Sequence, residues 1–324
     1  MFSLCLGLLS IWMVILLLAG ILQYFLLPNL SFSQVSVWLS HLNAWLNISM
    51  RRFIANQTAA DNEATCRKPE LVIISKIENC HFANKWYEIA SQDHFWMQWR
   101  FFVFEKFLKQ IGVSMEKQLH VLEIGCGTGI FLRQMEQNTN WRIDGADINL
   151  EALENSVAER SRLFFYDVME ERAKFKQAYD IVILMDVLEH IEKPAEFLKA
   201  CFSHLRPGGV FIINIPAVQS MYSVYDEVMG HLRRCDREKL LKELEAITSS
   251  KIITIYWGIT LLPLLFLRKL FISKNASKDN IVKKGFQPPG RFSHAVLKSL
   301  MGIELLFFKK PPVGTSLMGA VFVP

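Results

Sequence analysis

Three glycines alternate with other residues in Gly125-Cys126-Gly127-Thr128-Gly129, directly after the apolar segment 121–124 and directly before a helical stretch from Ile130 to Gln137. Glycines at this spacing let the backbone turn sharply and approach a ligand that a Cβ atom would block, and a helix start offers unpaired N–H groups. A phosphate-binding loop would need Gly-Lys-Ser/Thr, which is absent, and the dinucleotide fingerprint spaces its glycines differently. The segment therefore predicts a ligand-binding loop of another kind, with a plain strand-to-helix turn as the alternative.

Acidic side chains lie in or directly after the apolar segments around this loop. Glu123 precedes the glycines, Asp147 ends the next apolar segment, and Asp167 follows the one after that. Ligands of open parallel sheets bind beyond the carboxyl ends of the strands, so we expect these three carboxylates to converge with the glycine loop on one crevice. A carboxylate about 20 residues after such a loop suits a ribose diol. The alternative is that each Asp is only a turn or cap residue.

From Leu119 onward, short apolar segments alternate with segments of helical periodicity, which predicts βαβ units and a parallel sheet. Strands are expected over 119–124, 141–147, 162–166, 179–185, 209–214, 251–257 and 316–323. Helices are expected over 86–110, 130–137 and 194–205, and another is expected to follow Asp236 as its N-cap.

The segment Leu4–Leu27 contains no acidic, basic or histidine residue. As a helix it would be about 36 Å long, enough to cross a hydrocarbon core of ~30 Å. A cleaved signal peptide is the alternative, but the basic n-region and a clear cleavage site are missing. We therefore predict a single-pass transmembrane anchor over 1–30 and an interfacial segment and linker over 31–84. The first basic residues, Arg51 and Arg52, favour a cytoplasmic location for the remainder of the chain.

The C-terminal part of the chain is basic, although the net charge of the whole chain is only +5. Its basic residues follow and interleave the apolar run Gly258–Leu267, which is too short to span a membrane. A membrane-surface segment explains both features, and a buried helix with a solvated basic flank is the alternative. A basic region can also mark nucleic acid, but no base-handling motif of the Asn-Pro-Pro-Tyr type follows 179–185, so no nucleic-acid partner is expected.

Taken in order, five motifs resemble those of the class I S-adenosylmethionine-dependent methyltransferases. They are Glu123-x-Gly125-x-Gly127-x-Gly129, Asp147, Asp167, Asp186-Val187-Leu188-Glu189-His190 and Leu205-Arg206-Pro207-Gly208-Gly209. The resemblance implies an α/β, Rossmann-like sheet of seven strands with an antiparallel last strand over residues 85–324, carrying a substrate-side or membrane-surface insertion at about 258–312. It also implies S-adenosylmethionine as cofactor, bound by Glu123, Gly125, Cys126, Gly127, Gly129, Asp147, Ile148, Asp167, Val168 and Asp186.

Two further motifs resemble membrane-associated bacterial methyltransferases of surface-polysaccharide or lipid-linked pathways. They are Asp93-His94-Phe95-Trp96-x-x-x-Arg100 and Tyr225-Asp226-x-x-x-Gly230-His231-Leu232-Arg233-Arg234, although Cys235 stands where those proteins have an aromatic residue. This resemblance implies a hydrophobic or lipid-linked acceptor, with Trp96, Arg100, Tyr225, Arg233 and Arg234 as the candidate substrate-binding residues.

Methyl transfer from a sulfonium is an in-line displacement, so alignment can supply most of the catalysis and a base is needed only if the acceptor must lose a proton. His190 and His231 are the candidate bases. No metal is predicted. If one binds, the candidate ligands are Asp186, Glu189 and His190, because Asp-x-x-Glu-His is similar to the Glu-x-x-Glu-His of ubiquinone-pathway O-methyltransferases.

The leading hypothesis from the sequence is a membrane-anchored S-adenosylmethionine-dependent methyltransferase that acts on a lipid-linked or membrane-embedded small molecule. One alternative is a quinone-pathway O-methyltransferase, which would be distinguished by metal dependence and a phenolic acceptor. Another is a membrane scaffold with a methyltransferase fold and no activity, although the intact glycine loop and acids count against it.

Overall fold

The computed structural model describes residues 69–76, 91–92, 94–271, 281, 297, 300–302, 304 and 310–324. All of these residues lie in one compact unit, residues 67–324. The predicted anchor at Leu4–Leu27 and most of the predicted interfacial segment lie outside the described residues. Within the described ranges, no helix combines the length and the apolar character that crossing a membrane requires.

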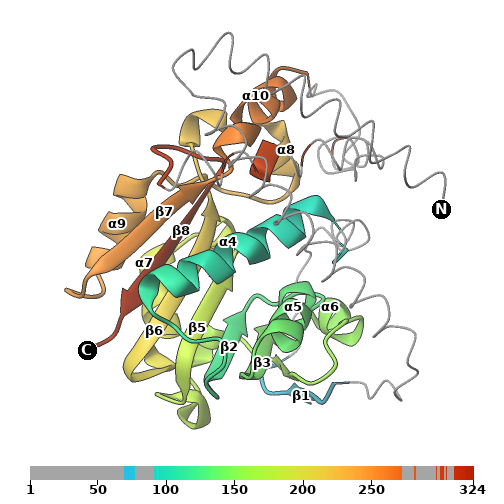
Figure 1. Ribbon diagram of the computed structural model, residues 1–324. Helices are drawn as coiled ribbons and strands as arrows, with labels where there is room; N and C mark the ends of the chain where they lie inside the picture. The colour runs from blue at the N-terminus through green and yellow to red at the C-terminus, as the bar shows by residue number, and fades with distance from the viewer. Residues whose placement is uncertain are drawn as a thin grey trace, which may run out of the picture. The chain divides into compact units, whose positions relative to one another are not determined.

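The unit is built on a single sheet whose strands run in the order β1-β4-β3-β2-β5-β6-β8-β7 (Figure 1). The final strand, β8, pairs antiparallel with both of its neighbours, whereas the other paired strands are parallel. The α/β class and the antiparallel last strand are therefore confirmed. The strands are β1 (Leu71–Ile73), β2 (His120–Ile124), β3 (Arg142–Asp147), β4 (Arg162–Phe165), β5 (Tyr179–Met185), β6 (Leu205–Pro216), β7 (Ile252–Trp257) and β8 (Ser316–Phe322).

The sheet has eight strands where seven were expected. The additional strand, β1, pairs in parallel with β4 at the sheet edge, and it lies inside the segment predicted to be a linker. A run of three residues is too short to show strand alternation, so the sequence pattern did not reveal it. The segment also reaches the site, because the Ser75 hydroxyl accepts a hydrogen bond of 2.9 Å from the backbone N–H of Asp167.

The α-helices of the described residues are α4 (Phe95–Ile111), α5 (Ile130–Asn138), α6 (Leu150–Glu154), α7 (Pro194–Ser203), α8 (Val224–Val228), α9 (Arg237–Glu245) and α10 (Leu262–Phe271). Short 3₁₀ turns occupy η1 (Val168–Glu170), η2 (Ala173–Phe175), η3 (Leu188–His190), η4 (Gln219–Met221) and η5 (Ile259–Leu261). Helix α4 begins later than predicted because His94 caps it, its Nδ1 accepting from the Trp96 N–H at 3.3 Å. Helix α9 follows Asp236 as predicted, but the Asp236 side chain accepts from the Gln219 N–H instead of capping the helix.

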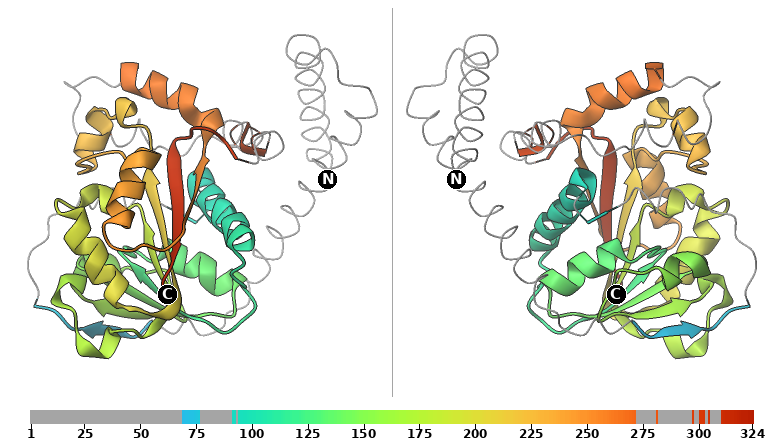
Figure 2. Two further views of the ribbon diagram at one scale, coloured as in Figure 1. Left: turned by 90° about the vertical axis from the view of Figure 1, so that its left-hand side faces the viewer. Right: turned by 90° about the vertical axis from the view of Figure 1, so that its right-hand side faces the viewer.

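Two apolar cores lie on opposite faces of the sheet, because successive residues of a buried strand point to opposite sides. In β5, Ile181 and Ile183 join the core that contains residues of α4 and α5. Their neighbours Val182 and Leu184 join the core that contains residues of α7 and α9. The helices accordingly cover both faces (Figure 2), and the carboxyl ends of the central parallel strands are left to form a site.

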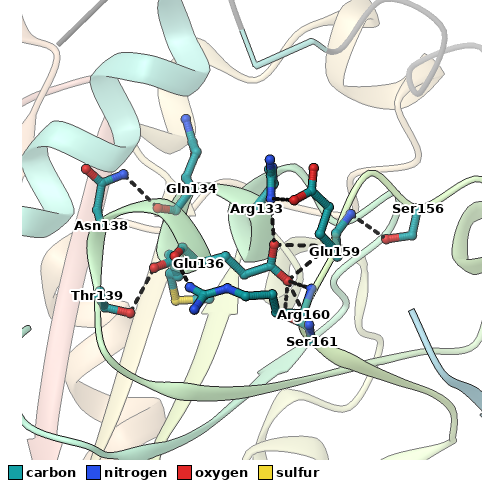
Figure 3. Close-up of polar contacts among 11 residues, drawn as sticks. Arg133, Gln134, Glu136, Asn138, Thr139, Ser156, Glu159, Arg160 and Ser161 are labelled. Atoms are coloured by element: carbon teal, nitrogen blue, oxygen red, sulfur yellow. Dashed lines mark hydrogen bonds and ion pairs between the residues drawn. The ribbon is translucent and has the colours of Figure 1, made fainter. Parts of the chain in front are cut away.

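A buried carboxylate at the end of α5 holds the loop between α6 and β4 (Figure 3). Glu136 accepts hydrogen bonds from the backbone N–H groups of Glu159, Arg160 and Ser161 and from the Ser161 hydroxyl, at 2.7–3.2 Å. Burial alone would raise the pKa of Glu136, but these hydrogen bonds lower it below its ordinary value, so the side chain is ionised at neutral pH.

The loop held by Glu136 packs against the glycine loop. The backbone N–H of Val157 donates to the Thr128 carbonyl at 2.9 Å. A Cβ atom on Gly129 would approach the Ser156 hydroxyl oxygen to 2.4 Å, so the two loops are in close contact at a position where Gly129 has a φ of +73°. The glycine loop is therefore packed against a fixed surface.

Candidate active site

A cavity of about 1090 Å³ lies beyond the carboxyl ends of β2, β3, β4 and β5 and extends to α4, α8 and α10. Pockets of ~300–1,000 Å³ hold single small ligands, so this cavity has room for a cofactor and an acceptor together. Of the predicted residues, those that line it are Glu123, Gly125, Cys126, Gly127, Asp147, Ile148, Asp167, Val168, Asp186, Trp96, Arg100, Tyr225, Arg234, His190 and His231. Gly129 and Arg233 are not among its lining residues.

The glycine loop adopts the backbone conformation that only glycine reaches without strain. Gly125 and Gly127 have φ angles of +74° and +52°. A Cβ atom on Gly125 would meet the Val187 side chain at 2.4 Å, so the loop after β2 touches the loop after β5. The Cys126 thiol is buried beneath the loop, where burial raises its pKa well above the ordinary value. Cys126 therefore presents its backbone to the cavity.

Asp147 lies at the end of β3 and binds the glycine loop directly. Its Oδ2 accepts from the Gly127 N–H at 2.7 Å, and its Oδ1 accepts from the Asn149 N–H at 2.8 Å. Burial raises the pKa of Asp147 although these amides favour its charged form. Each carboxylate oxygen has a second lone pair, so Asp147 can still accept hydrogen bonds from two hydroxyls.

Asp167, which follows the neighbouring strand β4, provides a second carboxylate beside apolar side chains. The Oδ1 of Asp167 accepts from the Met169 N–H at 2.9 Å and caps η1. Ile148, which is exposed, and Val168, which is buried, also line the cavity. This edge therefore combines a flat apolar surface with a carboxylate, which suits a planar heterocycle that carries an amino group.

Glu123 is a buried residue of β2 whose carboxylate lines the cavity. Its side chain is 2% exposed, and within the described residues its Oε2 has no hydrogen-bond partner. Burial raises the pKa of Glu123 to about 8, against the opposing charge of Arg100. An orphaned acceptor that lines the cavity suits an incoming ammonium group. The residues beyond the ends of β2, β3 and β4 thus fit S-adenosylmethionine: Glu123 would pair with its ammonium, Asp147 would accept from its ribose hydroxyls and Asp167 would accept from its adenine amino group.

Arg100, a predicted substrate-binding residue, is paired within the protein. Its Nη1 donates to Asp186 Oδ2 at 2.7 Å, and the Asn214 Nδ2 donates to Asp186 Oδ1 at 2.7 Å. Both oxygens of Asp186, a predicted cofactor ligand, are therefore engaged. The Trp257 Nε1 donates to Asn214 Oδ1 at 2.9 Å, and Trp96 stacks on the Trp257 ring with centroids 4.6 Å apart. This chain of contacts fixes α4 over the ends of the central strands.

His231 is oriented by a buried carboxylate. Its Nδ1 lies 3.1 Å from Asp226 Oδ1, and the Arg234 Nε donates to the same oxygen at 2.9 Å. Burial would raise the pKa of Asp226, but the hydrogen bond from His231 and the charge of Arg234 hold it well below its usual range. Because Asp226 is ionised, Nδ1 of His231 donates to it, so in the neutral form of the ring the lone pair is on Nε2. His231 can therefore accept a proton in the cavity.

The other two predicted substrate-binding arginines, Arg233 and Arg234, also have partners within the protein. Arg234 is buried, and besides Asp226 it donates from Nη1 to the Ala217 carbonyl at 3.1 Å. Arg233 donates from Nη2 to the Ile191 carbonyl at 2.6 Å, which ties its loop to the segment after η3. Both were predicted to bind the substrate, but Arg233 is not among the residues that line the cavity, and Arg234 is paired with Asp226.

His190 and Glu189 adjoin His231. Burial lowers the pKa of His190 to about 4, and the neighbouring His231 adds to this effect, so His190 is neutral at pH 7. Its Nδ1 donates to the Gly230 carbonyl at 3.1 Å. Glu189 is fully buried, its Oε1 lies 4.0 Å from His231 Nε2, and burial raises its pKa well above the ordinary value.

The candidate metal ligands in the structure differ from the set Asp186, Glu189 and His190 that the sequence suggested. Asp186 is held by Arg100 and Asn214, whereas Glu189, His190 and His231 present ligand atoms within 4.8 Å of one another. His231 joins the set because the loop after α8 returns to η3, where the Leu232 N–H donates to the Glu189 carbonyl at 2.8 Å. Sequence spacing could not show this contact.

The part of the cavity lined by Tyr225, His231 and α10 is called the acceptor end below. It contains residues that the sequence patterns did not indicate. Arg268, on α10, places its Cζ 4.0 Å from the centroid of the Tyr225 ring. Leu264 and Leu267 of the same helix also line the cavity. The only local signal was the apolar run that precedes Arg268, which indicated a membrane-surface segment or a core helix and not a cavity wall. Asp226 belongs to the motif that also contains His231, but the loop after α8 separates the two residues, so their spacing did not reveal the contact.

Comparison with known proteins identifies the family. Residues 86–253, just over half of the chain, match the family described as "Methyltransferase domain". Curated relatives include a ubiquinone biosynthesis O-methyltransferase of Yersinia pestis, 33% identical over 110 residues (32% of this chain, 43% of the relative). Another, of Caulobacter sp., carries the same name and is 31% identical over 100 residues (29% of this chain, 40% of the relative). The matches span about two-fifths of the length of these relatives.

Among solved structures, a SAM-dependent methyltransferase from Archaeoglobus fulgidus is 16% identical, covers 74% of this chain and 96% of its own, and aligns with a TM-score of 0.45. The family match shows that this chain belongs to the methyltransferase-domain family. The predicted methyltransferase is thereby confirmed, and S-adenosylmethionine is the cofactor that the residues beyond β2, β3 and β4 fit. Family membership favours an enzyme over the inactive scaffold that the sequence left open.

The raised pKa of Glu123 predicts pH-dependent cofactor binding. Below pH 8 most Glu123 is protonated and must ionise to pair with an ammonium, so binding releases a proton. Affinity for S-adenosylmethionine should rise between pH 6 and pH 7.5, by at most about tenfold per pH unit. Calorimetry in two buffers of different ionisation enthalpy measures both the affinity and the number of protons released on binding. Glu123→Gln should flatten the pH dependence, and an equally steep profile in that variant would contradict the assignment.

Proposed function

We propose that this protein transfers the methyl group of S-adenosylmethionine to a hydroxyl group of an apolar, membrane-resident acceptor. The observation that carries the proposal is the composition of the acceptor end of the cavity. A histidine held by a buried carboxylate lies in it, and exposed leucines of α10 form part of its wall. The first feature supports removal of a proton from the acceptor, and the second supports an apolar acceptor.

Nε2 of His231 accepts the hydroxyl proton, and the electron pair of that O–H bond becomes available to the acceptor oxygen. The ionised Asp226 stabilises the imidazolium and keeps Nδ1 protonated, so the lone pair stays on Nε2. The cofactor supplies an electrophilic methyl on a sulfonium that leaves as a neutral thioether. Glu123, Asp147 and Asp167 hold it at the opposite end of the cavity, which leaves alignment as the main source of catalysis.

Helix α10 supports a membrane-resident acceptor. Leu264, Phe266, Leu267 and Leu270 are exposed, whereas Leu261 and Leu265 are buried. A cluster of large exposed apolar side chains is unusual for a surface in water and typical of a membrane or ligand contact. Because Leu264 and Leu267 also line the cavity, an acceptor could pass from a bilayer into the site along this helix.

The predicted anchor at 1–30 fits this proposal, with the catalytic unit on the cytoplasmic side. An anchor would confine the enzyme to the surface where the acceptor resides and so raise its effective concentration. The expected partners are accordingly the cofactor, a hydrophobic or lipid-linked acceptor and the membrane.

Methyl transfer to lipid tests the acceptor class. Full-length protein is incubated with methyl-labelled S-adenosylmethionine and membrane lipid extract, and label is counted in the organic phase. Leu267→Glu should lower incorporation about tenfold, equivalent to about 1.4 kcal/mol, because it places a charge on the apolar wall. Ile73→Glu is the matched control, since Ile73 is also exposed (55%, against 45% for Leu267) but lies on the edge strand β1. Equal activity of the two variants, or label only in water-soluble products, would refute a lipid acceptor.

The role of His231 as the base is tested in the same assay. His231→Gln should lower kcat by about 100-fold or more while the Kd for S-adenosylmethionine stays unchanged, because the cofactor end is untouched. Asp226→Asn should also lower kcat, since an amide no longer fixes the tautomer of His231. A full kcat in His231→Gln would show that the acceptor needs no base at this position.

A second candidate, a quinone-pathway O-methyltransferase with a phenolic acceptor, is favoured by the cluster of Glu189, His190 and His231. Within the described residues neither Glu189 carboxylate oxygen has a hydrogen-bond partner, so the donor set fits a divalent cation. Such a cation would act as a Lewis acid toward a phenol oxygen. Loss of activity on chelation, with recovery on adding Mg²⁺, would favour this function, and activity unaffected by chelation would favour the first.

A further inference from the structure

We propose that Arg268 forms an anion-binding subsite at the acceptor end of the cavity, and that the acceptor therefore carries a phosphate or carboxylate next to its apolar part. This inference rests on the proposed function and names the substrate class of the same site. The geometry of α10, the pairing of the other cavity arginines and the surroundings of the Arg268 guanidinium support it.

Arg268 is a cavity-lining residue of a helix whose only other charged residue is Lys269. The Arg268 guanidinium lies over the Tyr225 ring at 4.0 Å. The next residue, Lys269, is exposed and donates from Nζ to the Ser220 carbonyl outside the cavity. Two consecutive basic residues of one helix thus have different surroundings, and only the first is placed to meet a bound acceptor.

The other arginines of the cavity are neutralised by carboxylates. Arg100 is paired with Asp186, and Arg234 is paired with Asp226. In the part of the chain that the structure describes, Arg268 has no carboxylate within ion-pair distance, and its enclosed Nε has no hydrogen-bond partner. An enclosed guanidinium donor is costly when left unpaired, and an oxyanion bound beside it would remove that cost.

The surroundings of Arg268 increase the need for that anion. Burial lowers the pKa of Arg268 below its ordinary value, and the nearby Arg234 adds to this effect, although Tyr225 and the charge of Asp226 oppose it. An oxyanion would relieve both the desolvation and the repulsion between the two guanidinium groups. A guanidinium is also the side chain best suited to the task, because its planar fork can bind two oxygens of a phosphate or carboxylate at once.

Helix α10 is fixed firmly enough to place a recognition residue. At its start, Glu304 accepts from the Gly258 N–H at 2.7 Å and from the Thr260 N–H and hydroxyl at 3.1 Å. With Leu264 and Leu267 on the same wall, the helix presents one cation beside an apolar surface, which matches an acceptor with an anionic group and an apolar chain.

Binding of a short amphiphile tests the subsite without knowledge of the natural acceptor. Full-length protein in a nonionic detergent is titrated by calorimetry with hexyl phosphate and hexanoate, with 1-hexanol and inorganic phosphate as references. Wild type is compared with Arg268→Gln, Arg268→Lys and Lys269→Gln. The last is the matched control, because it removes one positive charge from the adjacent position of the same helix.

We expect wild type to bind at least one of the two anionic amphiphiles at least tenfold more tightly than either reference. Arg268→Gln should lose this preference, Arg268→Lys should retain part of it, and Lys269→Gln should retain all of it. Equal affinity of wild type and Arg268→Gln for both amphiphiles, or an equal loss in Lys269→Gln, would overturn the proposal. Inorganic phosphate binding as tightly as hexyl phosphate would overturn the amphiphilic acceptor.

Each variant is also titrated with S-adenosylmethionine. Unchanged cofactor affinity in Arg268→Gln shows that the fold and the cofactor end are intact, so the loss of hexyl phosphate binding then belongs to the subsite. Absence of cofactor binding in wild type would instead count against the proposed methyl transfer, whatever the behaviour of Arg268.

Discussion

The hydrogen bond from the Gly127 amide to the Asp147 carboxylate joins the loop after β2 to the end of β3, and the cofactor end of the cavity depends on it. The Gly125 N–H donates to the Ala146 carbonyl at 2.7 Å and reinforces the same junction. These bonds require positive φ angles that glycine supplies without cost. The loop held by Glu136 packs against the other side, so the binding surface is formed before any ligand arrives.

In the remainder of the cavity, two arginines are paired with carboxylates, and His231 is left able to take a proton from an acceptor. The pairs Arg100–Asp186 and Arg234–Asp226 fix α4 and the loop after α8. The contact with Asp226 occupies Nδ1 of His231 and leaves Nε2 as the ring nitrogen that can take a proton. The Arg234–Asp226 pair thus fixes the loop and orients the candidate base. The exposed leucines of α10 line the same cavity. This arrangement underlies our proposals for the hydroxyl acceptor and its apolar character.

Much of this site could be predicted because it follows from local patterns. The alternation of strands and helices, the glycine spacing and the carboxylates at strand ends are each visible within a few residues, and parallel topology brings Glu123, Asp147 and Asp167 together. Contacts between distant segments could not be predicted. Arg100 and Asp186 are 86 residues apart, and nothing near either one indicates the other. The same holds for Arg268 over Tyr225 and for the short edge strand β1.

The central claim, that the glycine loop and Asp147 form a preorganised site for S-adenosylmethionine, is tested most directly by calorimetric titration of wild type and Asp147→Asn. The amide of the variant directs N–H donors toward the Gly127 or Asn149 amide, so it should weaken both the loop and the ribose contact. Glu154→Gln, an exposed substitution on α6, is the control. We predict micromolar binding by wild type and by Glu154→Gln, about −8 kcal/mol, and a loss of about 100-fold in Asp147→Asn. Equal affinity in all three proteins would contradict the account.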